Sequence, residues 1–154
     1  MIMRRCGKTS RNLIVVVTLT LTVAAGGLYL LQPRPDTESS NRLADATAAL
    51  ERNDLAAAEK LARQAIAANE QPAAARLIAG KAAAGRGQFA EAVQLWKEIP
   101  TAEAAIAIEG AVLAGNSLLD HLHKATQAEA MFRRALEIDN SHVPALKRLV
   151  FLLA

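Results

Sequence analysis

The chain has 154 residues, of which 52% are hydrophobic and only 3% aromatic, so alanine and leucine dominate its apolar content. Its formal net charge of +3 is concentrated before residue 12, and the rest of the chain is close to neutral, which excludes an extended nucleic-acid-binding surface there. The single cysteine, Cys6, excludes an internal disulfide.

An uncharged segment of nineteen residues runs from Leu13 to Leu31. As a helix it would rise about 28 Å, close to the thickness of a bilayer's hydrocarbon core, so we predict one transmembrane helix over 13–31. Residues 1–12 form a predicted basic tail, and residues 32–40, which include two prolines, a predicted linker. The positive-inside rule places the N-terminus in the cytoplasm and the rest of the chain across the cell membrane, in the periplasm if the protein is bacterial.

A cleaved secretory signal is the alternative interpretation of the same segment. Val23, Ala24 and Ala25 could serve as a small-residue cleavage site after a ten-residue apolar region. We favour a retained single-pass anchor because Leu28–Leu31 continue the apolar run beyond that site and Tyr29 suits the membrane interface. Both interpretations export the remainder of the chain.

A pattern of small and bulky apolar residues recurs between residues 41 and 154. Its members share the spacing i, i+4, i+7, which is one face of a helix: Ala58, Ala62 and Ala65; then Ala92, Trp96 and Ile99; then Ala128, Phe132 and Ala135. The first two sets are 34 residues apart and the last two 36 apart. The pattern predicts seven helices joined by short loops, over 41–52, 55–69, 72–85, 88–99, 102–119, 125–138 and 143–153. We therefore predict an all-α fold of antiparallel helix hairpins over 41–154.

Several local features support a resemblance to a known repeat family. Turn-forming pairs at Asn53-Asp54 and Gly87-Gln88 each precede an apolar residue, Gly80 lies twelve residues before Ala92, and Arg134–Asp139 has the composition of a typical second-helix end. These features resemble tetratricopeptide repeats, 34-residue helix pairs that stack into a solenoid. The resemblance implies about three repeats followed by a final single helix. It also implies a close approach of the paired helices at Gly80, because the family keeps a small residue at that position.

The chain also departs from the family's pattern. Ala62 stands where a bulky aromatic residue is usual, and Pro100 ends the second repeat early. The third repeat carries two extra residues, which we place between Gly115 and His123.

The final helix is predicted over 143–153, with Pro144 in its first turn. Its apolar stripe is expected to pack against the preceding hairpin and consists of Leu146, Leu149, Val150 and Leu153. Phe151 and Leu152 lie off that stripe and are expected to be exposed. Because a solenoid end normally needs a polar cap, this helix predicts a truncated chain, a partner on its apolar face, or self-association.

No catalytic, cofactor-binding or metal-binding residues are predicted. Gly7-Lys8-Thr9 lacks the glycine that a phosphate-binding loop has five residues earlier, where Ile2 stands. His121 and His123 would point about 200° apart on a helix, with only Asp120 nearby as a third ligand. We therefore expect no cofactor and no enzymatic activity.

The resemblance implies a binding function. In tetratricopeptide repeats the first helix of each pair lines an inner groove, where peptide segments dock. The residues that would face this groove are Leu43, Thr47, Leu77 and Lys81, joined by Leu113 and Ser117 if the two extra residues lie before the third pair. The expected function is a membrane-anchored scaffold for a protein or peptide partner. The alternatives are a fragment of a longer protein with a catalytic domain beyond residue 154, and a self-associating structural module.

The topology leads to a first prediction. A reporter enzyme that is active only outside the cytoplasm should be active when fused after Ala154, because four cationic residues before Leu13 hold the N-terminus inside. Replacing those four residues with glutamine should reduce that activity. Activity only from a cytoplasmic reporter at the same site would contradict the predicted localisation.

Overall fold

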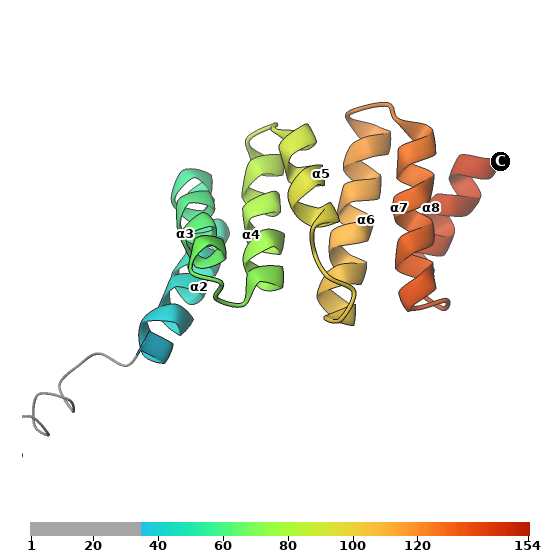
Figure 1. The fold of residues 1–154 in the computed structure, drawn as a ribbon. Coiled ribbons are helices and arrows are strands. Elements are labelled where there is room, and N and C mark those ends of the chain that lie inside the picture. The colour runs from blue at the N-terminus through green and yellow to red at the C-terminus, as the bar shows by residue number, and fades with distance from the viewer. Residues whose placement is uncertain (1–34) are drawn as a thin grey trace, which may run out of the picture. The chain divides into compact units, whose positions relative to one another are not determined.

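The computed structural model describes residues 35–154, which are helical throughout apart from short connections and contain no strand. Neighbouring helices lie side by side in chain order (Figure 1). They are α2 (Pro35–Glu51), α3 (Leu55–Ala67), α4 (Pro72–Gly85), α5 (Phe89–Lys97), α6 (Ala104–Asp120), α7 (Ala125–Ile138) and α8 (Val143–Leu153). The all-α prediction is confirmed for these residues.

The helix bounds agree with the predicted ones to within two residues, except at the start of α2. That helix begins at Pro35 rather than at residue 41, so residues 35–40 of the predicted linker are helical. A proline is well tolerated at the first helical position because its missing N–H has no intrahelical partner there. The predicted tail over 1–12 and the predicted membrane helix over 13–31 lie outside the described residues. Within 35–154, no helix has the length and apolarity that crossing a membrane requires.

The same tight turn joins the two helices of each hairpin. Its central residue has a left-handed backbone at Asn53 (φ 59°), Gly87 (φ 80°) and His123 (φ 52°). In the first two turns, paired backbone hydrogen bonds close the preceding helix in the Schellman pattern, for example from the amide of Gln88 to the carbonyl of Ala83 at 2.9 Å. In the third turn, the amide of Lys124 donates to the carbonyl of Leu118, six residues earlier, whereas the corresponding bond in the second turn joins residues five apart.

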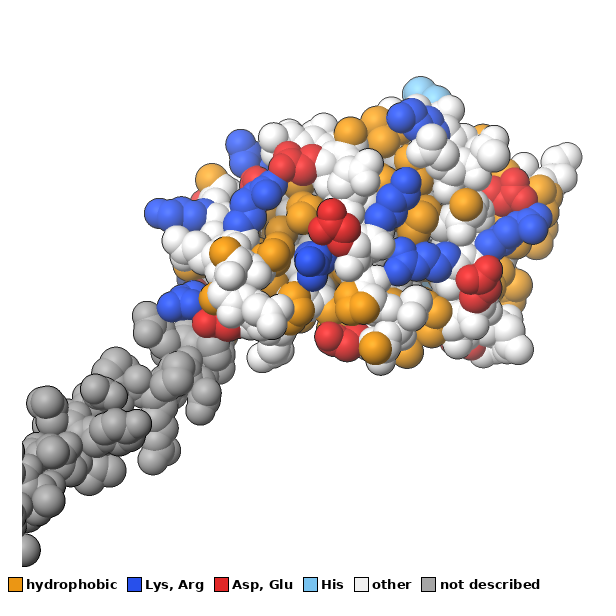
Figure 2. All heavy atoms as spheres, viewed as in Figure 1, with side chains coloured by type: hydrophobic (Ala, Val, Ile, Leu, Met, Phe, Trp, Pro, Cys, Tyr) orange, Lys and Arg blue, Asp and Glu red, His pale blue; other side chains and the backbone are white. Residues whose placement is uncertain are grey.

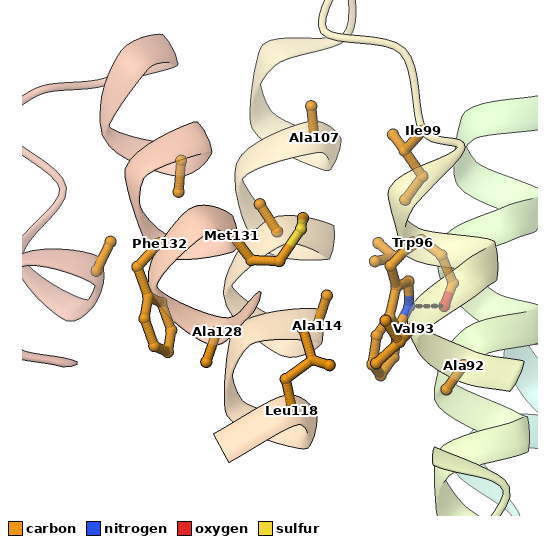
Figure 3. Close-up of a cluster of buried hydrophobic side chains, with 14 of the residues drawn as sticks. Ala92, Val93, Trp96, Ile99, Ala107, Ala114, Leu118, Ala128, Met131 and Phe132 are labelled. Carbon is orange, nitrogen blue, oxygen red and sulfur yellow. Dashed lines mark hydrogen bonds between the residues drawn. The ribbon is translucent and has the colours of Figure 1, made fainter. Parts of the chain in front are cut away.

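In the second and third hairpins, a glycine of the first helix packs against an aromatic ring of the second helix. A Cβ added at Gly80 would lie 2.3 Å from Nε1 of Trp96, and one added at Gly115 would lie 2.5 Å from a ring carbon of Phe132. Trp96 and Phe132 are almost fully buried (Figure 3), and the indole N–H of Trp96 donates to the carbonyl of Leu77 at 3.3 Å. The close helix approach that the sequence predicted at Gly80 is therefore confirmed, and it recurs at Gly115.

In the first hairpin, two small residues occupy the matching positions. Ala46 lies sixteen residues before Ala62, the separation between Gly80 and Trp96, and both alanines are fully buried in one cluster with Ile78. A small partner in α3 thus stands where the other two hairpins have an aromatic ring.

These contacts locate the two extra residues of the third hairpin. Gly80 and Gly115 are 35 residues apart, whereas the turn residues Gly87 and His123 are 36 apart. One extra residue therefore lies before Gly115, in the chain between Trp96 and α6, and only the other lies between Gly115 and His123. The prediction that placed both after Gly115 is wrong for one of them.

Ion pairs tie each hairpin to the next. Four of them join residues that are 28 apart, and each reaches from one helix to, or close to, the matching helix of the following hairpin. They are Arg42–Glu70, Arg63–Glu91, Lys81–Glu109 and Asp120–Arg148. In addition, Arg134 of α7 donates to the carbonyls of Lys97 and Ile99 at the end of the short helix α5. Exposed pairs contribute at most about 1 kcal/mol each, so they fix register more than stability.

The packing face of α8 differs from the predicted one. Ala145 is fully buried, and Leu149 and Leu152 pack against the core, whereas Leu146, Val150 and Leu153 are exposed. Three of the four residues of the predicted stripe therefore point away from α7, and Leu152, expected to be exposed, packs inward. The reason is that Ala145 takes the place of Gly110, 35 residues earlier, where a small side chain lets the helix approach the preceding hairpin.

The glycine–aromatic contact leads to a second prediction. Replacing Gly80 with leucine should destabilise the fold by on the order of 1–3 kcal/mol, because the side chain would overlap the ring of Trp96. Denaturant unfolding followed by circular dichroism measures the change. Gly87→Asn is the matched control, since an added Cβ at Gly87 meets nothing within 4 Å and Asn53 adopts the same backbone in the first turn. A Gly80→Leu variant no less stable than this control would contradict the contact.

Candidate functional site

A depression of about 260 Å³ opens between α6 and the N-terminal end of α8. It is lined mainly by apolar side chains, together with one carboxylate and one imidazole. The lining residues are Ala105, Ile108, Glu109, Val112, Leu113, His142 and Pro144. We refer to this site as the α6–α8 pocket.

The sequence of the two helices shapes this pocket. Ile108 and Val112 are four residues apart on α6, so they share one face, and Leu113 extends that face. Pro144 occupies the first turn of α8. The ring of His142 is held in place because its Nδ1 accepts a hydrogen bond from the amide of Ala145 at 3.4 Å, which caps α8. The result is an apolar floor with a fixed imidazole at one edge.

A salt bridge crosses between the first helices of two hairpins beside the pocket. Lys81 Nζ of α4 lies 2.6 Å from Oε1 of Glu109 on α6, and the two side chains are 36% and 49% exposed. Because Glu109 also lines the pocket, the pair forms part of its rim. The two charges neutralise each other while keeping hydrogen-bonding capacity toward solvent.

The structure brings together only some of the residues predicted to line a groove. Leu113 lines the pocket, and Lys81 reaches it through Glu109. Leu77 and Ser117 are buried, with 8% and 7% of their surface exposed, so their side chains belong to the interior rather than to an open surface.

The two predicted groove residues of α2 lie on another part of the surface. Leu43 is half-buried and packs against the cluster that contains Ala46 and Ala62. Thr47 is exposed, and its hydroxyl donates to the carbonyl of Leu43 at 2.9 Å, a bond within its own helix. Neither residue lines the α6–α8 pocket.

The sequence analysis missed Ile108 and Val112. The residues of α6 that correspond to Leu77 and Lys81 are Val112 and Asn116, because Gly80 and Gly115 are 35 residues apart. The sequence-based prediction used a spacing of 36 residues between the second and third hairpins, which gives Leu113 and Ser117 as the counterparts of Leu77 and Lys81. The recurrence of glycine before an aromatic residue was the signal in the sequence that could have fixed this register.

The histidines of the described residues have structural contacts. The ring of His121 stacks on Phe89 with centroids 3.7 Å apart and an interplanar angle of 6°. His123 forms the third hairpin turn, and His142 caps α8. Within residues 35–154, no group of three His, Cys, Asp or Glu side chains could hold a metal ion.

The second helices carry a charge network on a different surface. The carboxylate of Glu59 on α3 accepts from Arg63 and from Arg86, and Arg63 also pairs with Glu91 of α5. Burial raises the pKa of Glu59. The hydrogen bonds and charges of the two arginines lower it by more than burial raises it, so the pKa lies below its usual value of 4.5. The bonds to Glu59 also raise the pKa of Arg63.

Positive and negative side chains are interspersed with hydrophobic ones on the face shown in Figure 2. A second depression, of about 330 Å³, contains Arg63, Arg76 and Glu98. Both arginines are engaged, since Arg76 pairs with Glu98 at 3.3 Å and Arg63 belongs to the Glu59 network. This depression therefore offers no unpaired cation for an anionic ligand.

No family model matches this chain, and neither does any curated protein. Its function is therefore inferred from the geometry of the described residues and from the sequence pattern.

The Glu59 network leads to a third prediction. Because the pKa of Glu59 is lower in the folded state than in the unfolded state, its charge stabilises the fold above about pH 4.5, and that stabilisation is lost as the pH falls through the folded-state pKa. Glu59→Gln should therefore be less stable than the unmodified chain at pH 7, and the difference should shrink toward pH 3. Urea unfolding at several pH values measures it.

Glu137→Gln is the control for this comparison. Glu137 is exposed on α7 and forms no ion pair within residues 35–154. It should leave the pH dependence of stability unchanged. A stability difference for Glu59→Gln that stays constant from pH 7 to pH 3 would refute the assigned role.

Proposed function

We propose that this protein is a non-catalytic binding scaffold of the tetratricopeptide-repeat type, which receives a side chain of a protein or peptide partner in the α6–α8 pocket. The observation that carries the proposal is the apolar floor of Ile108, Val112 and Leu113 beside the Lys81–Glu109 salt bridge. An apolar recess with a few polar groups at its rim is the usual form of a site that anchors a partner residue.

The pocket is an open depression of about 260 Å³, at the small end of the roughly 300–1,000 Å³ range of pockets for drug-sized ligands. It suits one large apolar side chain. The neighbouring salt bridge supplies donors and acceptors for the backbone on either side of that side chain.

The recurring hairpins support assignment to this repeat type. The turn residues Asn53, Gly87 and His123 and the size-complementary contacts at Gly80 and Gly115 repeat with a period of 34 to 36 residues. Helix α4 contacts α6 directly, so the first helices of successive hairpins are neighbours. Such neighbours form a continuous surface, which a partner segment longer than one pocket can follow.

We further propose that the N-terminal segment 13–31 anchors the scaffold in the cell membrane, with the helical hairpins on the extracytoplasmic side. The charge-free run and the basic residues before it support this arrangement. An anchor of this kind keeps the binding surface close to the membrane and raises its effective concentration toward partners there.

Blocking the pocket tests the proposal and gives the fourth prediction. Peptides selected from a random displayed library against the full chain should contain a large apolar residue. Their affinity should fall about tenfold or more with Ala105→Trp, because the indole would fill the recess that their anchoring side chain occupies. Fluorescence anisotropy with labelled peptides measures the affinities.

Ala90→Trp is the matched control. Ala90 is exposed on α5 and does not line the pocket, so the same substitution there should leave peptide affinity unchanged. Equal loss in both variants, or no loss in Ala105→Trp, would reject the pocket as the binding site.

A further inference from the structure

The large exposed hydrophobic side chains of residues 35–154 lie on a single helix, α8. They are Val143, Leu146, Val150, Phe151 and Leu153. Hydrophobic side chains are visible at the right-hand edge of Figure 2, the end of the helical region at which Figure 1 places α8. Such a concentration on one helix is typical of an interaction surface.

Three of these residues form a regular face. Leu146, Val150 and Leu153 have the spacing i, i+4, i+7, and Val150 and Leu153 are 67% and 60% exposed. We call these three residues the outer stripe. Phe151 does not belong to it, because one residue along a helix turns the side chain about 100° away from Val150.

The preceding first helix shows what the outer stripe is built to contact. The residues of α6 that lie 35 positions before it are Ala111, Gly115 and Leu118, and all three are buried. Gly115 faces Phe132 of α7, as Gly80 of α4 faces Trp96 of α5. An adjacent face of α8, with Ala145, Leu149 and Leu152, already packs against the preceding hairpin. The outer stripe therefore occupies the positions that a second helix covers in the earlier hairpins.

We propose that the outer stripe is a docking site for an amphipathic helix of a partner protein, which packs on α8 as α5 packs on α4 and α7 on α6. This helix has a small residue opposite Val150 and an acidic residue next to Lys147. The surface lies outside the α6–α8 pocket, so the inference does not rest on the proposed peptide-binding function.

The need for a small residue in the docked helix is inferred from the sizes of the paired residues in the three hairpins. Glycine in the first helix is paired with tryptophan or phenylalanine in the second, and Ala46 lies with Ala62. At the equivalent position α8 has Val150, which is larger than either glycine or alanine. An aromatic residue opposite Val150 would force the helices apart, so the docked helix needs alanine or glycine there.

The need for an acidic residue in the docked helix is inferred from the positive charge of α8. Its charged residues are Lys147 and Arg148, with no acidic residue between Val143 and Leu153. Arg148 pairs with Asp120 of α6 at 3.1 Å, whereas Lys147 forms no ion pair within residues 35–154. Lys147 is exposed on the flank of the outer stripe, where a carboxylate of the docked helix would complement it.

The same two arguments disfavour a second copy of this chain as the occupant. The exposed apolar helix that another copy would present is α8 itself. Its outer stripe has no small residue, since it consists of two leucines and a valine, and it would bring lysine rather than a carboxylate to the flank of Lys147. Both size and charge are therefore unfavourable for an α8–α8 pair.

Binding of synthetic helices to the full chain tests this proposal. The probe is a peptide with the sequence of residues 54–69, a second helix with alanine at its centre, made acidic by Lys60→Glu and Arg63→Glu. Fluorescence anisotropy should show saturable binding. The same peptide with Ala62→Trp should bind about tenfold more weakly or worse, because its indole overlaps Val150.

Variants of α8 localise the site and test the size rule. Leu153→Gln should reduce binding about tenfold, and Lys147→Glu should weaken the acidic peptide more than its parent sequence. Val150→Gly should reverse the preference, so that the Ala62→Trp peptide binds better than the Ala62 peptide. Phe151→Gln is the comparison variant, since Phe151 is 72% exposed and lies on the same flank as Lys147 rather than on the stripe, so it should reduce binding less than Leu153→Gln does.

Three outcomes would overturn the inference. One is equal loss of binding in Phe151→Gln and Leu153→Gln, and another is preference of the unmodified chain for the Ala62→Trp peptide. The third is sedimentation showing a dimer of the full chain that Leu153→Gln dissociates, which would make a second copy the occupant. Ala105→Trp, which fills the α6–α8 pocket, should not change binding of these peptides, so failure of the two proposals can be told apart.

Discussion

The distance between paired helices in the second and third hairpins depends on one contact, in which an aromatic ring of the second helix fills the space that a missing side chain leaves in the first. Trp96 fits over Gly80 and Phe132 over Gly115, at separations that admit no Cβ. In a core made mostly of alanine, these rings supply much of the buried volume (Figure 3). Because protein interiors are close-packed, a change in either member of the pair moves a whole helix rather than one side chain.

Polar contacts then decide how one hairpin stacks on the next. The ion pairs between residues 28 apart join matching helices of neighbouring hairpins, and Arg134 binds the carbonyl groups left free at the end of α5. These interactions are exposed and individually weak, but their geometry is specific, so they favour one alignment of neighbouring hairpins. Because of this stacking, the first helices and the second helices of the hairpins form different surfaces. The Glu59 network joins second helices, and the α6–α8 pocket opens between first helices.

Two surfaces with different chemistry result from this arrangement. The α6–α8 pocket is small and has a salt bridge at its rim, which suits a single side chain of a flexible segment. The outer stripe of α8 is longer and apolar, with a lysine at its flank, which suits a helix. A partner that engaged both would gain affinity from linkage without any new contact. Both proposals describe a scaffold, whose role is to hold partners together.

The helical class and nearly all helix bounds could be predicted from the sequence alone, because helical periodicity, turn residues and prolines act over a few neighbouring residues. The close approach at Gly80 was implied by the resemblance, which has a small residue twelve positions before Ala92, and the structure identifies Trp96 as its partner. The early start of α2 was not predicted, because residues 36–40 are polar and have no apolar periodicity.

Only the tertiary structure decided which faces meet. Helix α8 is apolar on more than one side, so its periodicity could not show that Ala145, Leu149 and Leu152 pack inward while Leu146, Val150 and Leu153 face out. The same limit applied to α6, where a shift of one residue separates Val112 from Leu113 as the counterpart of Leu77. Such choices depend on contacts between residues 16 to 35 positions apart, and a pattern within one helix carries no information about its neighbour's surface.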